Sequence, residues 1–321
     1  MKLHIICERD VGLFSLIQQV IANVPWALRE KRVPIAYFQE KTCYWTPHGY
    51  QGSDTVWEYY FEPIHPVYPA AIIPQHIRDR ISKEHPHPLQ VGYAIGEEAF
   101  VSNHFGDHPD LLGKTLFIPY LLEDPDDALR REASTLLRDY IRPRAYLEEK
   151  VDRFFANHMK GRPVIGVHIR GTDAASTEEI RWHRQGSLQL ANYVAEIGQL
   201  LKAEPGARIF VATDEQSSLD RMKGEFGDRV IHYDSVRHSG GQAAGQGPTG
   251  WIMPAYIAGD RDRAARNGEE AVIEYLLLAR CNHLVHNGSG LARTVLLKAP
   301  EMPYSNTNGA LWGRARAAAA G

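Results

Sequence analysis

Short apolar runs alternate with helical patterns throughout the C-terminal half of the chain, and few folds accommodate this order. The runs that fit buried strands are 164–170, 208–214, 229–233 and 283–287. The segments between or after them that fit helices are 187–203, 215–226, 268–280 and 290–298. Strands that alternate with helices predict a parallel sheet with helices on both faces. Ligands of such sheets bind outside the carboxyl ends of the strands.

The N-terminal half shows a weaker version of the same α/β pattern. Its predicted elements are strands at 3–7 and 33–38 and helices at 14–27, 124–139 and 143–158. We therefore predict an N-terminal domain of residues 1–160 and a C-terminal domain of residues 161–300, with the boundary near Lys160. Residues 301–321 form a tail that we expect to be partly frayed.

An aromatic segment of the N-terminal half, DTVWEYYFEP at 54–63, has two interpretations. In a strand, Trp57, Tyr59 and Phe61 would share one face, with Tyr60 on the other. We favour a strand of the domain core. The alternative is an acceptor wall on which a sugar ring stacks.

Charge and cysteine content exclude several classes of protein. The net charge is −3, so no overall basic field exists to bind nucleic acid or an anionic membrane. Cys7, Cys43 and Cys281 form no CxxC pair, which argues against a disulfide framework or a zinc site and suits a reducing cytoplasm. The N-terminus does not resemble a secretory signal, and no apolar run reaches the ~20 residues of a membrane span. We expect a cytoplasmic protein.

The run VIGVHIRGTD, residues 164–173, places polar side chains where a buried strand ends. Arg170 offers a planar fork of donors that suits phosphate; its structural alternative is an ion pair with Asp173 or Asp214. His168 lies two residues earlier and therefore on the same side of the strand. It is either a ligand-facing residue or a hydrogen-bonded core histidine. Because the chain lacks an overall basic field, an anionic ligand must be met by local groups of this kind.

Acids near the first two strand ends are also open to two interpretations. Glu178 and Glu179 follow in the loop after the first strand, where a carboxylate is either a general base or a solvated acid. Asp214 and Glu215 end the second strand. They either bind a ligand hydroxyl or a basic partner, or they cap the next helix and interact with its dipole.

The last strand is joined to its helix by Asn287-Gly288-Ser289-Gly290. Glycines allow the backbone to approach a ligand, and a helix start offers free N–H groups to an anion. The alternative is a tight turn with Ser289 as helix cap. No GK[ST] follows, and the GxGxxG pattern is absent, so this is neither a Walker A loop nor a dinucleotide fingerprint. Glu274, on the preceding helix, has the strong alternative of a solvated surface acid.

As a set, HIRGTD, VATDE and EEAVIEYLLLARCNHLVHNGSGLAR resemble the donor-binding domain of a fucosyltransferase superfamily. It includes bacterial nodulation fucosyltransferases, core α1,6-fucosyltransferases and protein O-fucosyltransferases. The resemblance covers roughly residues 160–300. It implies a GT-B fold, in which two Rossmann-like α/β domains enclose a cleft for GDP-fucose. It also implies an inverting transferase without metal or other cofactor, whose acceptor is a glycan, a glycolipid or a protein.

The resemblance implies roles for the phosphate-side residues. Arg170 matches an arginine that grips the donor diphosphate, and Ser289, after Gly288, matches a phosphate-contacting serine. His168 matches a histidine at the nucleotide. A preorganised arginine and helix N–H groups would stabilise the charge that develops on the leaving GDP.

Three acids receive roles from the same resemblance. Glu274 matches the acid that would read guanine through its ring N–H and exocyclic amine. Glu178 falls where core enzymes keep a glutamate proposed as the base that takes the acceptor's proton. Asp214 matches the aspartate of their ATDD segment.

The chain also departs from the core enzymes. Their second arginine is Gly171 here, and their following lysine is Ala174. Their coiled-coil stem and SH3 module are absent, and no DxD metal motif is apparent. Three alternatives therefore stay open: a transferase of the same fold with another nucleotide sugar, a non-catalytic nucleotide- or glycan-binding protein, and a nucleotide-sugar hydrolase.

Overall fold

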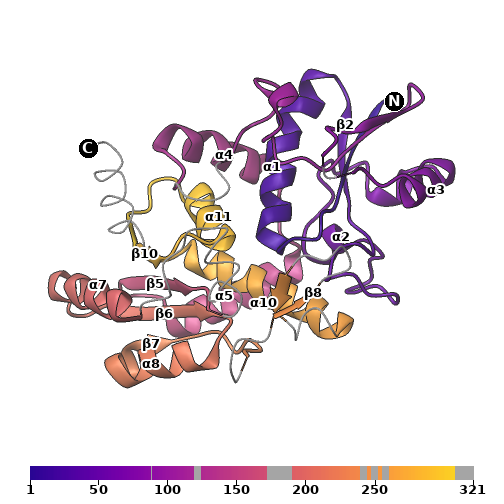
Figure 1. Ribbon diagram of the computed structural model, residues 1–321. Coiled ribbons are helices and arrows are strands. Elements are labelled where there is room, and N and C mark those ends of the chain that lie inside the picture. Colours follow the sequence, from indigo (N-terminus) through magenta and orange to yellow (C-terminus); the bar gives the residue numbers. More distant parts are fainter. Residues whose placement is uncertain are drawn as a thin grey trace.

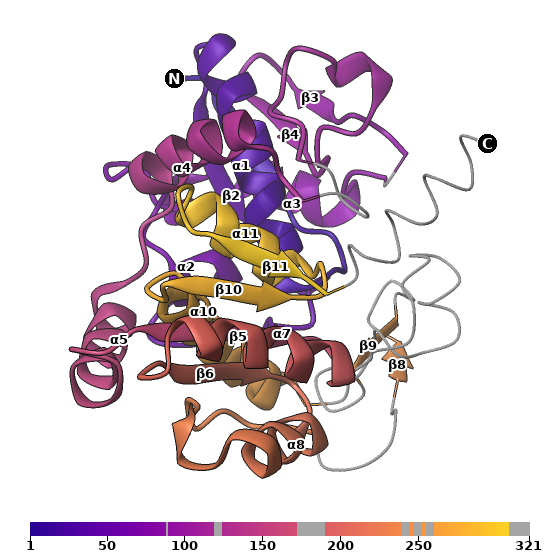
Figure 2. The same cartoon turned by 90° about the vertical axis from the view of Figure 1, so that its left-hand side faces the viewer.

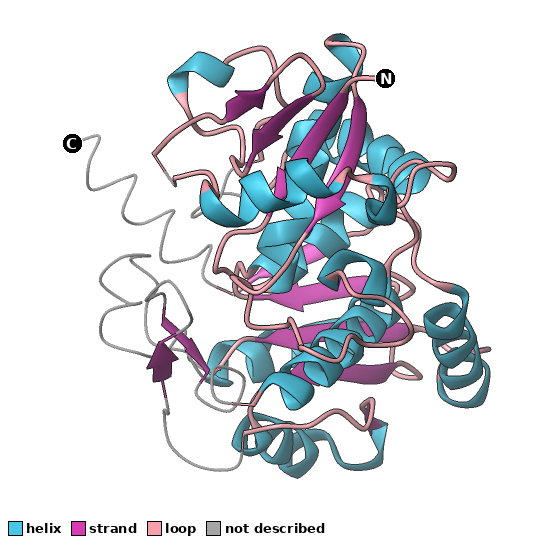
Figure 3. Ribbon diagram, turned by 90° about the vertical axis from the view of Figure 1, so that its right-hand side faces the viewer, coloured by secondary structure: helices cyan, strands magenta, loops and turns pink. Residues whose placement is uncertain are grey.

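The alternation of strands and helices produces two sheets in an α/β architecture (Figure 1). The structure is a computed structural model that describes residues 1–87, 89–118, 124–171, 190–238, 244–246, 252–254 and 260–307. Among these residues, no helix is both long and apolar enough to cross a membrane. Figure 3 shows the two sheets one above the other, with helices on both sides.

The N-terminal sheet has the strand order β2-β1-β4-β3. Its strands are β1 (Leu3–Cys7), β2 (Val33–Tyr37), β3 (Tyr93–Ile95) and β4 (Ala99–Ser102). The helices of this half are α1 (Leu13–Arg29), α2 (Val56–Tyr60), α3 (Gln75–Lys83), α4 (Asp127–Tyr140) and α5 (Ala145–His158). Strand β1 is parallel to β2 and β4. Its alternate residues separate two apolar layers, because Leu3, Ile5 and Cys7 join the cluster of α3 whereas Ile6 joins that of α1.

The C-terminal sheet has the order β11-β10-β5-β6-β7, and all its pairings are parallel. Its strands are β5 (Val164–Ile169), β6 (Arg208–Thr213), β7 (Val230–Ile231), β10 (His283–His286) and β11 (Tyr304–Asn306). Its helices are α7 (Leu190–Ala203), α8 (Gln216–Phe226), α10 (Arg261–Leu278) and α11 (Gly290–Lys298). Strands β8 (Ala244–Gln246) and β9 (Ile252–Pro254) form a separate antiparallel pair. The predicted tail thus begins within the sheet, at β11.

Both faces of this sheet are covered, as the continuous apolar strands predict. Ile165, Val167 and Ile169 of β5 pack in one cluster with residues of α7 and α8. On the other face, Val164 and Phe210 belong to the cluster that contains α10 and α11. The β-branched residues of β5 suit a strand buried on both sides.

One hydrophobic cluster joins the two halves of the chain. It includes Leu16 and Ile17 of α1 together with Val295 and Leu296 of α11. Figures 1 and 2 show α11 between α1 and strand β10. The division near residue 160 falls between α5 and β5, and it stays a prediction.

Helix α10 begins earlier than the sequence pattern predicts. We expected it to start at Gly268, but Asp260 caps a helix that already begins at Arg261, and its carboxylate accepts the N–H of Arg263 at 3.0 Å. Gly268 therefore lies inside the helix, and it is at the position where the Tyr60 side chain packs against the helix. A Cβ at this glycine would come within 2.3 Å of the Tyr60 hydroxyl, which donates to the carbonyl of Ala265 at 2.6 Å.

The aromatic segment 54–63 contains the helix α2, so the predicted strand is wrong. Burial confirms the core interpretation, since Trp57, Tyr59, Tyr60 and Phe61 are each at most 1% exposed. These rings offer no surface on which an acceptor sugar stacks. Tyr60 instead holds α2 against α10.

Candidate active site

Four of the predicted site residues, His168, Arg170, Asp214 and Gly288, lie at or just beyond strand ends at the carboxyl edge of the C-terminal sheet. In the register, His168 of β5 pairs with Ala212 of β6 and with His286 of β10. The residues just beyond these ends are linked by hydrogen bonds. The Gly171 N–H donates to Asp214 Oδ1 at 2.9 Å, and Asn287 Nδ2 donates to the Arg170 carbonyl at 3.4 Å. Three separate strand ends are therefore held together.

Ser289 joins the helix start to the first strand. It caps α11, because its Oγ accepts the Ala292 N–H at 3.1 Å. The same Oγ lies 3.0 Å from His168 Nδ1. Since the oxygen already accepts from the backbone, we assign its hydrogen to the bond with Nδ1, which leaves the ring hydrogen on Nε2. The Tyr193 hydroxyl also holds His168, because it donates a hydrogen bond to the His168 carbonyl at 3.0 Å.

His168 is a neutral donor in this arrangement. Burial lowers its pKa to about 3, and electrostatic interactions with His286 and Arg170 lower it further. The imidazole therefore carries no charge near neutral pH. It can offer an Nε2–H to an anion, but it has no proton to give as an acid.

Three buried histidines should make the protein sensitive to acid. The pKa of His168 is lowered to about 3, and burial lowers those of His4 and His286 to about 4. The unfolded chain binds more protons than the folded one between these values and about 6.5, so the free energy of unfolding falls as pH falls through that window. We expect a lower Tm at about pH 4.5 than at pH 7.

Calorimetry across this pH range measures the effect. Glu274 works in the opposite direction, because its raised pKa makes the folded state bind more protons between about 4.5 and about 7. His4→Gln removes one of the three histidine contributions, so its Tm should depend less on pH than that of the wild type. A Tm that rises on acidification would contradict this prediction.

Glu274 is a buried acid, so the solvated-surface interpretation is wrong. It lies on α10 and is 7% exposed. Ser235 Oγ donates to its Oε1 at 2.7 Å, and Arg237 Nη2 approaches the same oxygen at 3.4 Å. Burial raises its pKa to about 7, although Arg237 and Ser235 lower it, while Glu270 and Asp214 contribute a further rise.

The second carboxylate oxygen of Glu274 is available to a ligand. No described residue donates to Oε2, and this atom is not among the buried polar atoms that lack a partner. The influence of Asp214 on its pKa places Glu274 near the end of β6. A carboxylate oxygen of this kind accepts N–H or O–H donors of a bound molecule.

Gly171 stands where the resembled enzymes keep a second arginine, and the structure explains the glycine. A Cβ here would lie 2.6 Å from Glu215 Oε2 and 3.1 Å from Glu215 Cβ. Glu215 is held in place by Ser218 Oγ, which donates to Oε2 at 2.7 Å. The space of a larger side chain is therefore occupied by a fixed carboxylate.

A matched pair of glycines tests this account. We expect Gly171→Ala to lower the free energy of unfolding by about 1–3 kcal/mol, the usual cost of an added group in a packed site. Gly198 lies on α7 with nothing within 4 Å of its Cβ direction, so Gly198→Ala should raise it by about 0.5–1 kcal/mol. Urea denaturation measures both. If both substitutions change the free energy of unfolding equally, the Glu215 side chain moves aside without cost, and this account is wrong.

Gly288 makes the turn from β10 to α11. Its φ is +87°, a conformation that favours glycine, and its N–H donates to His286 Nδ1 at 3.0 Å. The next glycine, Gly290, faces Ser15 of α1, with 3.6 Å between a Cβ built there and Ser15 Oγ. Gln18 of α1 donates to the Gly290 carbonyl at 2.9 Å. The helix start thus lies against the N-terminal half.

Several predicted residues are not placed. Glu178, Glu179, Asp173 and Ala174 lie in 172–189, outside the described residues. Arg170 is partly exposed, and its carbonyl accepts from Asn287. Asp214 accepts the hydrogen bond of the Gly171 N–H, so its carboxylate helps to position the backbone at the end of β5.

Sequence reasoning missed Ser235, Arg237 and Tyr193. The first two contact Glu274 from positions 39 and 37 residues away, in a segment without periodicity. Tyr193 lies on α7, within the predicted helix 187–203, and gave no signal of its hydrogen bond. Only a sheet topology that brings β7 beside β6 reveals these contacts.

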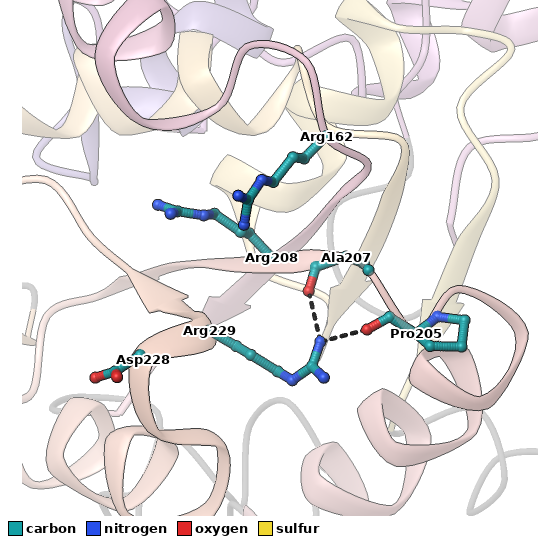
Figure 4. Close-up of a pocket in the computed structure, with 7 residues that line it drawn as sticks. Arg162, Pro205, Ala207, Arg208, Asp228 and Arg229 are labelled. Atoms are coloured by element: carbon teal, nitrogen blue, oxygen red, sulfur yellow. Dashed lines mark hydrogen bonds between the residues drawn. The ribbon is translucent and has the colours of Figure 1, made fainter.

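A pocket of about 450 Å³ lies elsewhere, at the amino ends of the strands (Figure 4). It is lined by Arg162, Pro205, Gly206, Ala207, Arg208, Asp228 and Arg229. The Arg229 guanidinium donates to the carbonyls of Pro205 and Ala207. Ligands of parallel sheets bind at the opposite edge, so we place the candidate site at the carboxyl ends.

Comparison with known proteins supports the fold. No family model matches the chain, and no curated protein matches it by sequence. Fucosyltransferase NodZ from Bradyrhizobium matches with TM-score 0.56 and 16% identity, over 96% of this chain and 97% of that one. NodZ α-1,6-fucosyltransferase soaked with GDP-fucose matches with TM-score 0.53 and 17% identity, over 94% of each. POFUT1 in complex with GDP matches with TM-score 0.51 and 12% identity, over 95% and 98%. These matches confirm the predicted fucosyltransferase-like α/β fold.

Proposed function

We propose that the chain is an inverting glycosyltransferase that moves fucose from GDP-fucose to a hydroxyl of a glycan, glycolipid or protein. The observation that carries this proposal is the meeting of Arg170, His168 and Ser289 at one strand edge, beside a buried acid with an available oxygen. The matched structures add support, because one was soaked with GDP-fucose and others were solved with GDP.

The diphosphate would lie against Arg170 and the start of α11. As the bond to fucose breaks, negative charge grows on the β-phosphate. In the proposed complex the Arg170 guanidinium and the N–H groups of the helix start would face this charge, so they would stabilise the transition state without reorganisation. The Nε2–H of His168 adds a neutral donor. No group in this description requires a metal ion.

The guanine base would be read by Glu274. Its ring N–H and exocyclic amine are both donors, and Glu274 Oε2 is an acceptor without a partner among the described residues. Ser235 and Arg237 hold the other oxygen, so the carboxylate is oriented before the nucleotide arrives. Uracil nucleotides present a different edge, and we expect them to bind weakly.

The acceptor hydroxyl would lose its proton to a carboxylate, for which Glu178 is proposed from the resemblance alone. The sugar becomes oxocarbenium-like as GDP leaves. Attack from the opposite face then inverts the anomeric centre in one displacement. The base would accept the proton as the new bond forms.

Calorimetric titration tests the proposal directly. The protein is titrated with GDP, GDP-fucose, GDP-mannose and UDP-sugars in the presence of a chelator. We expect selective binding of GDP and GDP-fucose that is lost in Arg170→Ala and kept in Arg208→Ala, an arginine at the opposite end of β6. Absence of GDP binding would overturn the proposal and leave the likeness as one of fold.

Product analysis separates the enzymatic alternatives. A transferase releases GDP from GDP-fucose slowly alone and faster with an acceptor. A hydrolase releases it at full rate without one, and a binding protein releases none in either case. Tighter binding of another GDP-sugar would keep the fold and the guanine site but change the donor.

A further inference from the structure

A second group of chemically active side chains lies in the N-terminal sheet. Cys7 is the last residue of β1, Glu8 follows it, and His85 comes just after α3. One ligand atom from each lies within 4.8 Å of those of the other two. None of these residues belongs to the strands and helices that carry the candidate active site.

The group is buried and poorly satisfied. Cys7 and Glu8 are at most 1% exposed, and the His85 side chain is 9% exposed. His85 Nε2 lies 3.6 Å from Glu8 Oε2, too far for a hydrogen bond, and it has no other partner. Glu8 Oε1 accepts only the Lys41 N–H, at 3.3 Å. A buried imidazole without a hydrogen bond beside a buried carboxylate with one long hydrogen bond is costly, so a cation between them would compensate both.

Tyr93 provides an independent sign of a missing ligand. Its hydroxyl is buried and has no hydrogen-bond partner. Its ring packs against the hydrophobic cluster that contains Cys7. Two polar atoms without a hydrogen bond, one from the segment after α3 and one from β3, therefore lie on the face of the sheet that carries this thiol.

We propose that Cys7, Glu8 and His85 bind a divalent transition metal ion, with zinc as the expected class. Zinc takes thiolate, imidazole and carboxylate at about 2.0–2.3 Å, which places donor atoms roughly 3.3–3.8 Å apart. The group needs only a modest contraction from its present spacing. Three protein ligands leave a fourth position for water, to which the Tyr93 hydroxyl is a suitable partner.

The metal would fix the end of β1. This strand leads into α1, whose first turn faces Gly290 and whose Gln18 binds the start of α11. The expected effect is therefore on stability rather than on donor chemistry. The proposal does not depend on the proposed transferase function. It departs from the sequence analysis, which expected no zinc site because the cysteines form no CxxC pair.

Metal titration of protein without a histidine tag tests the site. We expect Zn²⁺ and Co²⁺ to bind one per chain, to raise the Tm, and in the case of Co²⁺ to produce a thiolate charge-transfer band. A transition metal binds the thiolate, so binding at Cys7 releases the proton of the thiol. The affinity should therefore rise at least about tenfold for each unit of pH.

Variants decide between this site and any other. Cys7→Ser should abolish the cobalt–thiolate band and weaken Zn²⁺ binding at least about 10²-fold, since changes beyond the ligands alone cost 10–100-fold. Cys43→Ser is the matched control, because Cys43 is an equally buried thiol of the same half outside the group. His85→Gln, at the less buried edge, provides a second test if Cys7→Ser does not fold.

Two results would overturn the proposal. Absence of stoichiometric binding at any pH would show that Glu8 and His85 form a plain ion pair. A thiolate band that persists in Cys7→Ser and His85→Gln would place the metal elsewhere. Removal of bound metal by a chelator should lower the Tm and leave the affinity for GDP unchanged, which separates this site from the candidate active site.

Discussion

Replacing Arg170 by alanine is expected to lower the rate of fucosyl transfer by about 10²–10³-fold, the effect of losing one preorganised donor at a developing charge. Arg170 directly follows β5, and its positive charge lowers the pKa of the neighbouring His168. In the proposed reaction the β-phosphate gains charge at this strand end. The loss should therefore appear mainly in kcat, because the interaction strengthens in the transition state.

Single-turnover measurements with GDP-fucose and an acceptor found by screening give this rate. Arg170→Lys keeps the charge without the planar fork, so we expect an intermediate rate. Arg208→Ala removes an arginine from the opposite end of the neighbouring strand and should stay within about twofold of the wild type. Near-wild-type turnover of Arg170→Ala would remove this residue from the mechanism.

The strand-end set was predictable because its logic is local. A buried run that ends in HIR, and a second that ends in TD, must place these residues at one edge once the strands are parallel. Ser289 was likewise marked as a cap by the strand, turn and helix around it. The sequence pattern therefore indicates this part of the candidate site, where we propose that phosphate binds, without any knowledge of distant contacts.

The remaining features depend on contacts that no local pattern records. The five-residue helix α2 consists mainly of residues that favour strands, yet the bond from Tyr60 to Ala265, 205 residues away, fixes it against α10. The partners of Glu274 come from an irregular segment after β7. His85 meets Cys7 and Glu8 only because β1 and the end of α3 lie together. Side-chain packing, rather than propensity, decides these positions.

Replacing Glu274 by glutamine is expected to weaken GDP binding by about 10²-fold, given the proposed reading of guanine. A hydrogen bond to a charged group contributes about 1.5–3 kcal/mol. In the variant, the NH₂ group of glutamine would also face the N–H donors of guanine, with which it cannot form a hydrogen bond. The comparison of GDP with inosine diphosphate, which lacks the exocyclic amine, isolates the contact. The four affinities form a cycle whose coupling energy reports the interaction between the amine and the carboxylate.

The pH dependence gives the same contact a second signature. With a pKa of about 7, Glu274 is partly protonated at neutral pH, and the ionised form accepts from guanine more strongly than the neutral acid. The affinity of the wild type for GDP should therefore fall as pH falls below about 7, by up to about tenfold per unit. Glu274→Gln should lose this pH dependence of the affinity for GDP. Any pH dependence that remains in the variant should be the same for inosine diphosphate, because it comes from the phosphates that both nucleotides carry.

A neighbouring acid on the same helix provides the control. Glu269 is also buried, but it already has two partners from the N-terminal half, the Tyr50 hydroxyl and Lys150 of α5. Glu269→Gln should lower the free energy of unfolding, because it leaves Lys150 without its carboxylate, while the affinity for GDP stays within about twofold. If Glu274→Gln instead behaves like Glu269→Gln, with lower stability and unchanged GDP affinity, the acid supports the sheet and reads no base.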